Sequence, residues 1–213
     1  MYLPIHHRED RLGLQHDLIH TYPLGMLVIM GRAGLAANPV PFVLDAGASQ
    51  NGVLKAHIAR ANSLWQDYDP AHEALVIFQG PQIYVSPNYY ASKKETGKIV
   101  PTWNYVCVQA YGTLKVMDDR DWLLDQLGTL TRRHEADQPV PWSIADAPED
   151  YIAMMLKGII GFEIDIARIE GKWKLSQNRS AADQASLVEA LRHSAGENAS
   201  AIASLMAKDS GKS

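Results

Sequence analysis

The chain lacks the residues and segments that mark several large classes of protein. It contains one cysteine, Cys107, among 213 residues, which excludes an internal disulfide framework and a zinc site made of cysteines. Its longest apolar run, at residues 24–30, is much shorter than a membrane span and is interrupted by Gly25. The first residues lack the basic and apolar segments of a secretory signal peptide. We therefore expect a cytoplasmic protein that does not associate with membranes.

The composition is that of an ordinary folded protein, with 46% hydrophobic and 21% charged residues. Such a chain can form one sizeable domain or two small ones. The net charge of −4 is unevenly distributed, because residues 55–60, 92–98 and 168–179 carry net charges of +2, +2 and +3. Scattered cations on an acidic chain do not predict an extended nucleic-acid interface. If they converge, they suit a small anion such as a phosphate, although a solvated surface explains the same charges equally well.

Residue patterning predicts a strand-rich chain with helices toward its end. We expect strands at residues 24–30, 41–44, 74–79, 82–86, 103–110 and 162–169, with breaks at Gly80-Pro81 and Glu170-Gly171. We expect helices at residues 118–135, from about 146, and at 183–193 and 198–208, with fraying over 209–213. Short strands followed by peripheral helices favour a small antiparallel barrel over a doubly wound sheet.

No motif supports a nucleophilic or metal-dependent enzyme. The candidate hydroxyl nucleophiles have no recognisable elbow or base partner around them: Ser86, Ser92, Thr102 and Ser176. His16 and His20 have the i, i+4 spacing of a helical metal site, but no carboxylate pattern completes one. We therefore expect these histidines, with His6 and His7, to be surface residues. Cys107 lies in an apolar strand pattern and is expected in the core.

Four polar segments together carry aromatic residues and cations suited to a phosphorylated ring compound. In residues 55–62, Lys55, His57 and Arg60 flank a strand end that turns into a helix, where free N–H groups also favour a phosphate. Residues 84–90 and 100–105 add phenols, an indole and amides, and residues 172–179 add cations. Rings can stack on a flat ligand, amides can read its edges, and cations can hold its phosphate. A solvated helix start and core aromatics remain alternative explanations.

Five ordered blocks resemble the FMN-binding negative transcriptional regulator family of the PaiB type along nearly the whole chain. The blocks are MYLPIH at 1–6, HIARAN at 57–62, IFQGP at 77–81 with YVSP at 84–87, VPTWNY at 100–105, and EGKWKLSQNR at 170–179. Any one of these peptides is weak evidence, but their order over this span makes coincidence improbable.

The resemblance implies a mainly β (α+β) fold, an FMN-binding split β-barrel with peripheral and C-terminal helices. It implies an FMN-binding domain at residues 1–180, a helical extension at 181–213, and a homodimer with FMN in a groove at the subunit interface. The residues expected to bind the cofactor are Lys55, His57, Arg60, Gln79, Ser86, Trp103, Asn104, Lys174, Ser176, Gln177 and Arg179. The chain departs from the family pattern at His7, Ala56, Ser63 and Gln109, and the last departure argues against a metal or haem role for its strand.

The resemblance implies a dimeric regulator of gene expression. The wider split-barrel group suggests an alternative, a flavin-dependent oxidoreductase of the pyridoxamine-phosphate-oxidase-like group acting on a small molecule, for which no catalytic acid or base can be named. Haem binding through His57 or His72 is a third hypothesis. Direct DNA binding is not expected, because no helix-turn-helix pattern is present and an acidic chain is repelled by a duplex.

Overall fold

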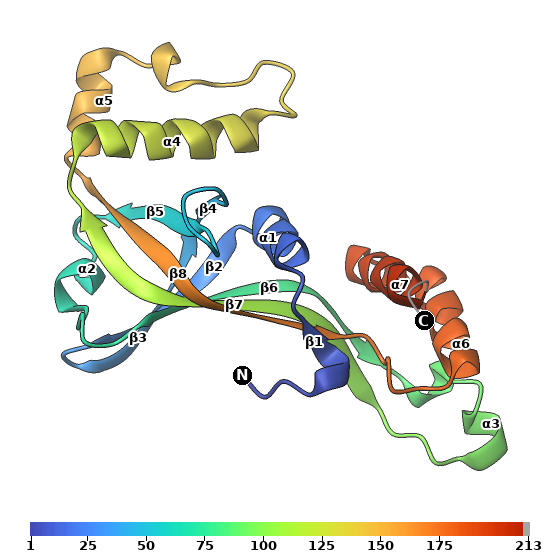
Figure 1. Ribbon diagram of the computed structural model, residues 1–213. Helices are drawn as coiled ribbons and strands as arrows, with labels where there is room; N and C mark the ends of the chain where they lie inside the picture. Colours follow the sequence, from blue (N-terminus) through green and yellow to red (C-terminus); the bar gives the residue numbers. More distant parts are fainter. Residues whose placement is uncertain (211–213) are drawn as a thin grey trace. The chain divides into compact units, whose positions relative to one another are not determined.

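The computed structural model describes the backbone of residues 1–210, which divides into two compact units (Figure 1). Unit 1 comprises Met1–Arg11, Gln79–Val108 and the described chain from Glu170 onward. Unit 2 comprises Leu12–Phe78 and Gln109–Ile169. Because the chain passes between the units several times, three long strands contribute residues to both.

In the part of the chain that the structure describes, eight strands form the sheet, in the order β3-β2-β6-β7-β8-β5-β4, with β1 paired to β8. They are β1 (Arg8–Glu9), β2 (Leu24–Gly31), β3 (Gly34–Pro41), β4 (Val43–Asp45), β5 (Val53–Ala59), β6 (Ala74–Val85), β7 (Thr102–Met117) and β8 (Ile159–Lys174). The registered pairings of β2 with β3 and β6, of β4 with β5, and of β8 with β1 and β5 are antiparallel. This sheet with its peripheral helices confirms the predicted α+β fold class.

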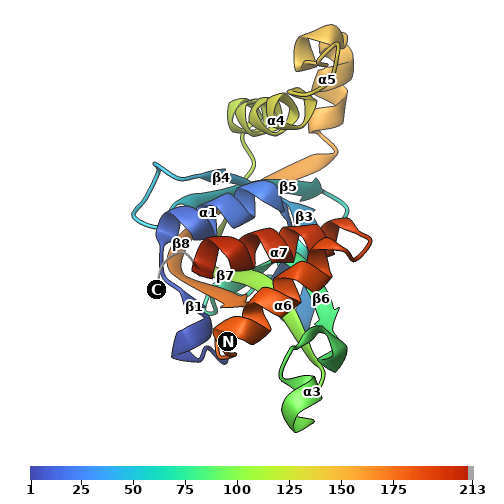
Figure 2. The same cartoon turned by 90° about the vertical axis from the view of Figure 1, so that its right-hand side faces the viewer.

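Within residues 1–210, seven α-helices accompany the sheet. They are α1 (Leu12–Thr21), α2 (Leu64–Asp67), α3 (Lys93–Thr96), α4 (Arg120–Glu135), α5 (Glu149–Leu156), α6 (Ala181–Arg192) and α7 (Glu197–Ser210). Short 3-10 helices cover Ile5–His7, Pro87–Tyr89 and Ile144–Asp146. The predicted start of α4 is confirmed, because the Asp119 carboxylate accepts a hydrogen bond from the Trp122 N–H at 2.8 Å. Ser180 caps α6 in the same way, and Figure 2 shows α6 and α7 together in unit 1.

The core of unit 2 brings together side chains that are far apart in the sequence. Phe42 packs edge-to-face against Phe78 and Phe162, with ring centroids 5.7 and 6.1 Å apart. Helix α4 lies against β4 and β5, and Gly161 on β8 makes room for it. A Cβ added at Gly161 would lie 2.2 Å from a ring atom of Trp122, so only glycine allows this close approach. The Trp122 indole also donates to Glu163 at 2.8 Å, which fixes α4 on the sheet.

The core of unit 1 combines the outer parts of the long strands with α6 and α7. Leu187, Leu191 and Ile202 are fully buried on these helices. Their burial supplies the apolar surface that a unit of this size needs. The predicted boundary at residue 180 stays a prediction, although both helices belong to unit 1 together with Met1–Arg11 and Gln79–Val108.

Both predicted strand breaks were wrong. Strand β6 continues through Gly80-Pro81, and its registered pairing with β2 ends at Ile77. The missing N–H of Pro81 therefore costs no hydrogen bond to β2. Strand β8 continues through Glu170-Gly171, because Gly171 and Lys172 pair with β1. Turn residues are local signals, and here pairing with distant strands overrides them.

Two smaller predictions also need correction, whereas the predicted start of α5 within residues 146–149 is confirmed. Helix α5 begins at Glu149, and the capping box forms earlier, between Ser143 and Asp146. His7 and His16 are buried rather than at the surface. Residues 209 and 210 continue α7 instead of fraying, and the rest of that predicted frayed end lies outside the described residues.

Candidate functional site

The predicted phosphate-binding residues of unit 2 lie at the end of β5 (the β5 basic group: Lys55, His57 and Arg60). Lys55 and His57 share one face of the strand, while Leu54, Ala56 and Ile58 point into the core, as the two-residue period requires. The chain then turns at residue 60 and continues into the single-turn helix α2. The predicted strand end followed by a short helix is therefore confirmed.

Each member of the β5 basic group already has a partner from another element. Lys55 Nζ lies 2.9 Å from Asp45 Oδ2 on β4. Arg60 donates to both oxygens of Asp118, at 3.0 and 2.6 Å. The Arg60 hydrogen bonds lower the pKa of Asp118, as the Lys55 hydrogen bond lowers that of Asp45. Both cations are therefore neutralised within the protein.

His57 faces helix α4. Its Nδ1 lies 2.8 Å from Gln126 Oε1, and Gln126 is almost fully buried. Among the residues that the structure describes, Gln126 Nε2 is the one buried side-chain nitrogen or oxygen with no hydrogen-bond partner. His57 is thus oriented by an amide and not by a charge.

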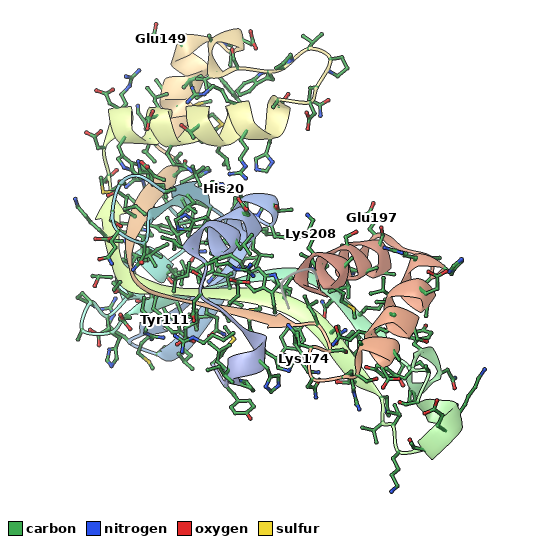
Figure 3. All side chains as sticks on the ribbon, turned by 45° about the vertical axis from the view of Figure 1, so that its right-hand side comes forward. His20, Tyr111, Glu149, Lys174, Glu197 and Lys208 are labelled. Atoms are coloured by element: carbon green, nitrogen blue, oxygen red, sulfur yellow. The ribbon has the colours of Figure 1, made fainter. Side chains whose placement is uncertain are left out.

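Unit 1 contains a second basic group, which differs from the first (the β8 basic cluster: His7, Lys172 and Lys174). Lys172 and Lys174 are two residues apart on β8 and so share one face of the strand. Their ammonium groups lie 5.4 and 6.0 Å from the centroid of the Tyr105 ring. Figure 3 labels Lys174 on β8, before the turn into α6.

The two lysines hydrogen-bond only to neutral oxygens. Lys174 Nζ donates to Thr102 Oγ1 at 2.6 Å and to the Trp103 carbonyl at 2.5 Å. Lys172 Nζ donates to the Tyr2 carbonyl at 2.9 Å. Within residues 1–210, neither lysine forms an ion pair with a carboxylate. The cluster therefore holds positive charge that nothing described in the chain neutralises.

The pKa values in this cluster reflect burial and mutual repulsion. Burial is the main reason that the pKa of Lys174 is lowered, and the charge of Lys172 lowers it further. Burial also lowers the pKa of His7, and the two lysines act in the same direction. The hydrogen bond between His7 Nδ1 and Gln177 Oε1, at 2.9 Å, opposes that shift. An anion placed here would relieve the repulsion.

Three of the predicted cofactor residues, Ser176, Gln177 and Arg179, lie in the turn that follows β8, and a fourth, Asn104 on β7, hydrogen-bonds to it. The buried Ser176 donates to Asn104 Oδ1 at 3.0 Å and lies 3.2 Å from the Tyr90 hydroxyl. Ser176 has φ of 62°, a left-handed conformation that is rare outside glycine. Gln177 accepts from the Leu175 N–H, and the Arg179 guanidinium lies 5.1 Å from the Tyr90 ring centroid. These bonds fix the chain directly beyond Lys174.

The other predicted residues of unit 1 lie on β6, β7 and the loop between them. Gln79 Nε2 donates to the Val106 carbonyl at 3.2 Å, and Ser86 caps the 3-10 helix Pro87–Tyr89. Trp103 is 52% exposed and packs edge-to-face with Tyr84, at 6.0 Å between centroids. The two rings line a groove of about 550 Å³ together with residues 195–199. Trp103 is the predicted residue best exposed for stacking on a flat ligand.

The structure places the predicted residues in two groups, one in each unit. Lys55, His57 and Arg60 belong to unit 2, and the other eight belong to unit 1. The prediction did not include His7, Lys172 or Tyr105 among the cofactor residues. The spacing of Lys172 and Lys174 on a strand could have indicated the pair. His7 comes from the far end of the sequence, and no local pattern connects it to them.

The structure also describes the possible metal ligands, the single cysteine and the helices that the sequence analysis considered. Within residues 1–210, no three His, Cys, Asp or Glu side chains form a group able to hold a metal ion. His16 instead bonds to the Asn51 carbonyl, and His20 pairs with Arg133. Burial raises the pKa of Cys107 to about 11, which confirms a core thiol. No helix in the described part of the chain is both long and apolar enough to cross a membrane.

Comparisons with known proteins show the family to which the chain is similar. Residues 1–168 match a family model described as "Putative FMN-binding domain". The protease synthase and sporulation protein PAI 2 of Bacillus subtilis is 34% identical over 208 residues, covering 97% of this chain and 96% of that protein. An uncharacterized protein of Emericella nidulans is 32% identical over 241 residues, with 97% and 96% covered.

A solved structure supports the fold. The FAD and heme binding protein of Mycobacterium smegmatis aligns with a TM-score of 0.53 and 17% identity, over 83% of this chain and 77% of that one. At this identity the likeness concerns the fold alone. The predicted split-barrel fold is thereby confirmed.

Proposed function

The chain belongs to the family of FMN-binding domains that its residues 1–168 match, and we propose from this that it is a PaiB-like regulatory protein working as an FMN-binding homodimer. The name of the B. subtilis relative refers to protease synthesis and sporulation, which supports a role in regulating gene expression. Cytoplasmic location and an effect on transcription without direct DNA contact remain parts of this proposal.

One observation carries the FMN proposal, namely the uncompensated charge of the β8 basic cluster. Lys172 and Lys174 sit close enough to depress the pKa of Lys174, and no described carboxylate pairs with either. A phosphate monoester carries a charge of about −1.5 to −2 near pH 7 and forms strong, short bonds to ammonium groups. The FMN phosphate has the negative charge and the acceptor oxygens that no described carboxylate supplies to this cluster.

The surroundings of the cluster fit the rest of the cofactor. Tyr105 lies beside both ammonium groups, and Trp103, whose carbonyl accepts from Lys174, is half exposed. Such rings can stack on an isoalloxazine. We propose that Lys174 holds the phosphate and that Trp103 contacts the ring. Asn104 and Ser176, which are bonded to each other, keep the turn beyond Lys174 in shape.

The test is a titration with FMN, followed by quenching of flavin fluorescence, of the unmodified protein and of Lys174→Met. Loss of a charge-assisted hydrogen bond is worth about 1.5–3 kcal/mol, so the Kd should rise roughly 10- to 150-fold. The matched control is Lys115→Met, because Lys115 is an exposed lysine on β7. Equal Kd values for all three folded proteins would overturn the assignment of Lys174.

Binding of the FMN phosphate by the β5 basic group remains a competing prediction. The roles of the other residues expected to bind FMN also stay predictions. Phosphate binding at the β5 basic group requires that Arg60 either leaves Asp118 or binds the phosphate while it stays paired with Asp118. Arg60→Ala would then weaken FMN binding and Lys174→Met would not. The two assignments therefore predict opposite results in the same titration.

The alternatives named from the sequence are testable in the same samples. FMN-dependent oxidation of NAD(P)H would support the flavin-dependent oxidoreductase, and its absence with a panel of reductants would count against it. A Soret band after addition of haem would support haem binding. Sedimentation of the FMN-loaded protein tests the homodimer, which predicts twice the chain mass of 23.6 kDa.

A further inference from the structure

Unit 2 contains a cavity that belongs to no part of the proposed phosphate site in unit 1. Its volume is about 440 Å³, within the range of small-molecule sites. It is lined by α4, α5, the segment between them, and the adjoining strand ends, and it is open to the surface. Its lining residues are His57, Leu127, Thr131, Trp142, Ile144, Tyr151, Ile152, Met155, Leu156, Gly158 and Ile159.

The lining is apolar except at a few points. It contains no Asp, Glu, Lys or Arg side chain, so a charged ligand would be desolvated without compensation. Trp142 and Tyr151 remain 44% and 48% exposed, although both are large rings that gain free energy from burial. A flat aromatic molecule would cover apolar surface of both rings.

His57 gives the cavity one directional polar group. Its Nδ1 is bonded to Oε1 of Gln126, which does not line the cavity, so the opposite edge of the imidazole faces it. An amide oxygen only accepts hydrogen bonds, and Nδ1 must therefore carry the hydrogen. In the neutral ring this leaves Nε2 as an acceptor.

The burial of Gln126 supports this orientation. Gln126 is 1% exposed, and its Nε2 has no partner in the described chain. Within the described chain, the hydrogen bond of this amide is the one that its oxygen makes with His57. The amide acts on His57, whose tautomer it fixes. Gln126 is thus a positioning residue for the acceptor inside the cavity.

We propose that this cavity binds a small, uncharged aromatic molecule carrying one hydroxyl or N–H group, which donates its hydrogen to His57 Nε2. The aromatic body lies against Trp142 and Tyr151, and the donor specifies the orientation. Where Lys174 holds the FMN phosphate, this cavity is separate from the phosphate site, because every lining residue belongs to unit 2 and the β8 basic cluster belongs to unit 1.

A pair of probes that differ only in the donor tests the proposal by calorimetry. 2-Naphthol carries a hydroxyl, whereas 2-methoxynaphthalene has the same rings and no donor. We expect both to bind, with 2-naphthol roughly three- to tenfold tighter, the range for one neutral hydrogen bond. His57→Phe should remove this preference while 2-methoxynaphthalene still binds. Gln126→Leu should reduce the preference, because the tautomer of His57 is no longer fixed.

The location is tested by filling the cavity. Thr131→Trp places a large ring in it from α4, and His134→Trp adds the same ring to an exposed position of that helix. We expect the first variant to lose both probes and the second to keep them, with unchanged melting temperatures.

Three results would overturn the proposal. They are equal affinity of the two probes, binding that survives Thr131→Trp, and no binding of either probe to folded protein. In the last case, sedimentation would show whether a second copy of the chain covers this face instead. The measurements use the full chain with and without FMN, so a failure of the FMN site leaves them interpretable.

Discussion

The β5 basic group and the β8 basic cluster have the same kinds of side chain and opposite electrostatic states. Lys55 and Arg60 are paired with carboxylates from other elements. Lys172 and Lys174 bond only to neutral oxygens and lie near each other and near one aromatic ring. A paired cation must give up its partner, or share it, to bind an anion, whereas an unpaired one gains its first counter-charge. The difference shows that availability of charge, not its amount, distinguishes the two candidate phosphate sites.

Reversing one charge of the β8 basic cluster should have the largest effect on FMN binding. In Lys174→Glu, the phosphate of FMN loses a cation and meets a carboxylate. We expect the Kd for FMN to rise roughly 100-fold or more. The fold should be kept, because the new carboxylate can pair with Lys172, so the melting temperature should not fall. Lys115→Glu is the control with equal charge change, and FMN binding by Lys174→Glu at the unmodified affinity would refute the cluster as the phosphate site.

The turn beyond Lys174 should be the next most sensitive feature. Ser176→Ala removes the hydroxyl bonded to Asn104 and keeps a Cβ at positive φ, so we expect a loss of about 1–3 kcal/mol in the free energy of unfolding. Ser176→Gly loses the same bonds but relieves the backbone, which should recover about 1 kcal/mol. Urea unfolding measures both. If the alanine variant were as stable as the unmodified protein, the buried network would not support this turn.

Sequence reasoning predicted the features that depend on neighbouring residues. The cap of α4 at Asp119, the core position of Cys107 and the fold class all follow from local patterns and from the family blocks. The continuity of β6 and β8 could not be predicted, because glycine and proline signal a turn locally while the pairing partners lie far away in the sequence. His7 and Lys172 are 165 positions apart, so only the fold brings them into one electrostatic environment.

The same limit applies to the candidate site residues. Lys55, His57 and Arg60 form a compact motif in the sequence, but Asp118, the partner of Arg60, and Gln126, the partner of His57, lie 58 and 69 residues later. A motif shows which groups are present and cannot show which of them are already neutralised. The cavity beside His57 was not predicted either, since its walls come from α4, α5 and two strands.

A pH titration of stability separates the two regions further. The pKa of His7 is lowered in the folded protein, so the unfolded chain takes up a proton first as the pH falls through about 6.5. Stability from the neutral His7 is therefore complete above that pH and decreases below it. The pKa of Asp118 is also lowered, and its contribution is complete above about 3.9 and decreases only below that value.

We therefore expect His7→Gln, which keeps an amide donor for Gln177, to lose less stability between pH 7 and pH 5 than the unmodified protein. Melting temperatures at the two pH values measure the effect. His6→Gln alters the exposed neighbour and should leave the unmodified pH dependence in place. A parallel decrease in all three proteins would show that burial beside the two lysines does not lower the pKa of His7.

Substitutions in the β5 basic group should have the smallest effect on the Kd for FMN. They test most directly whether the two basic groups differ in phosphate binding. Arg60 is engaged by Asp118 through two hydrogen bonds at the protein surface, and exposed ion pairs of this kind contribute little to stability. We expect Arg60→Met to change the Kd for FMN by less than about twofold, within the weak influence of a screened surface charge. Asp118→Asn frees the guanidinium and should have an equally small effect. If it instead tightened FMN binding several-fold, Arg60 would be a phosphate ligand that Asp118 restrains, and the two basic groups would have to be exchanged in the proposed site.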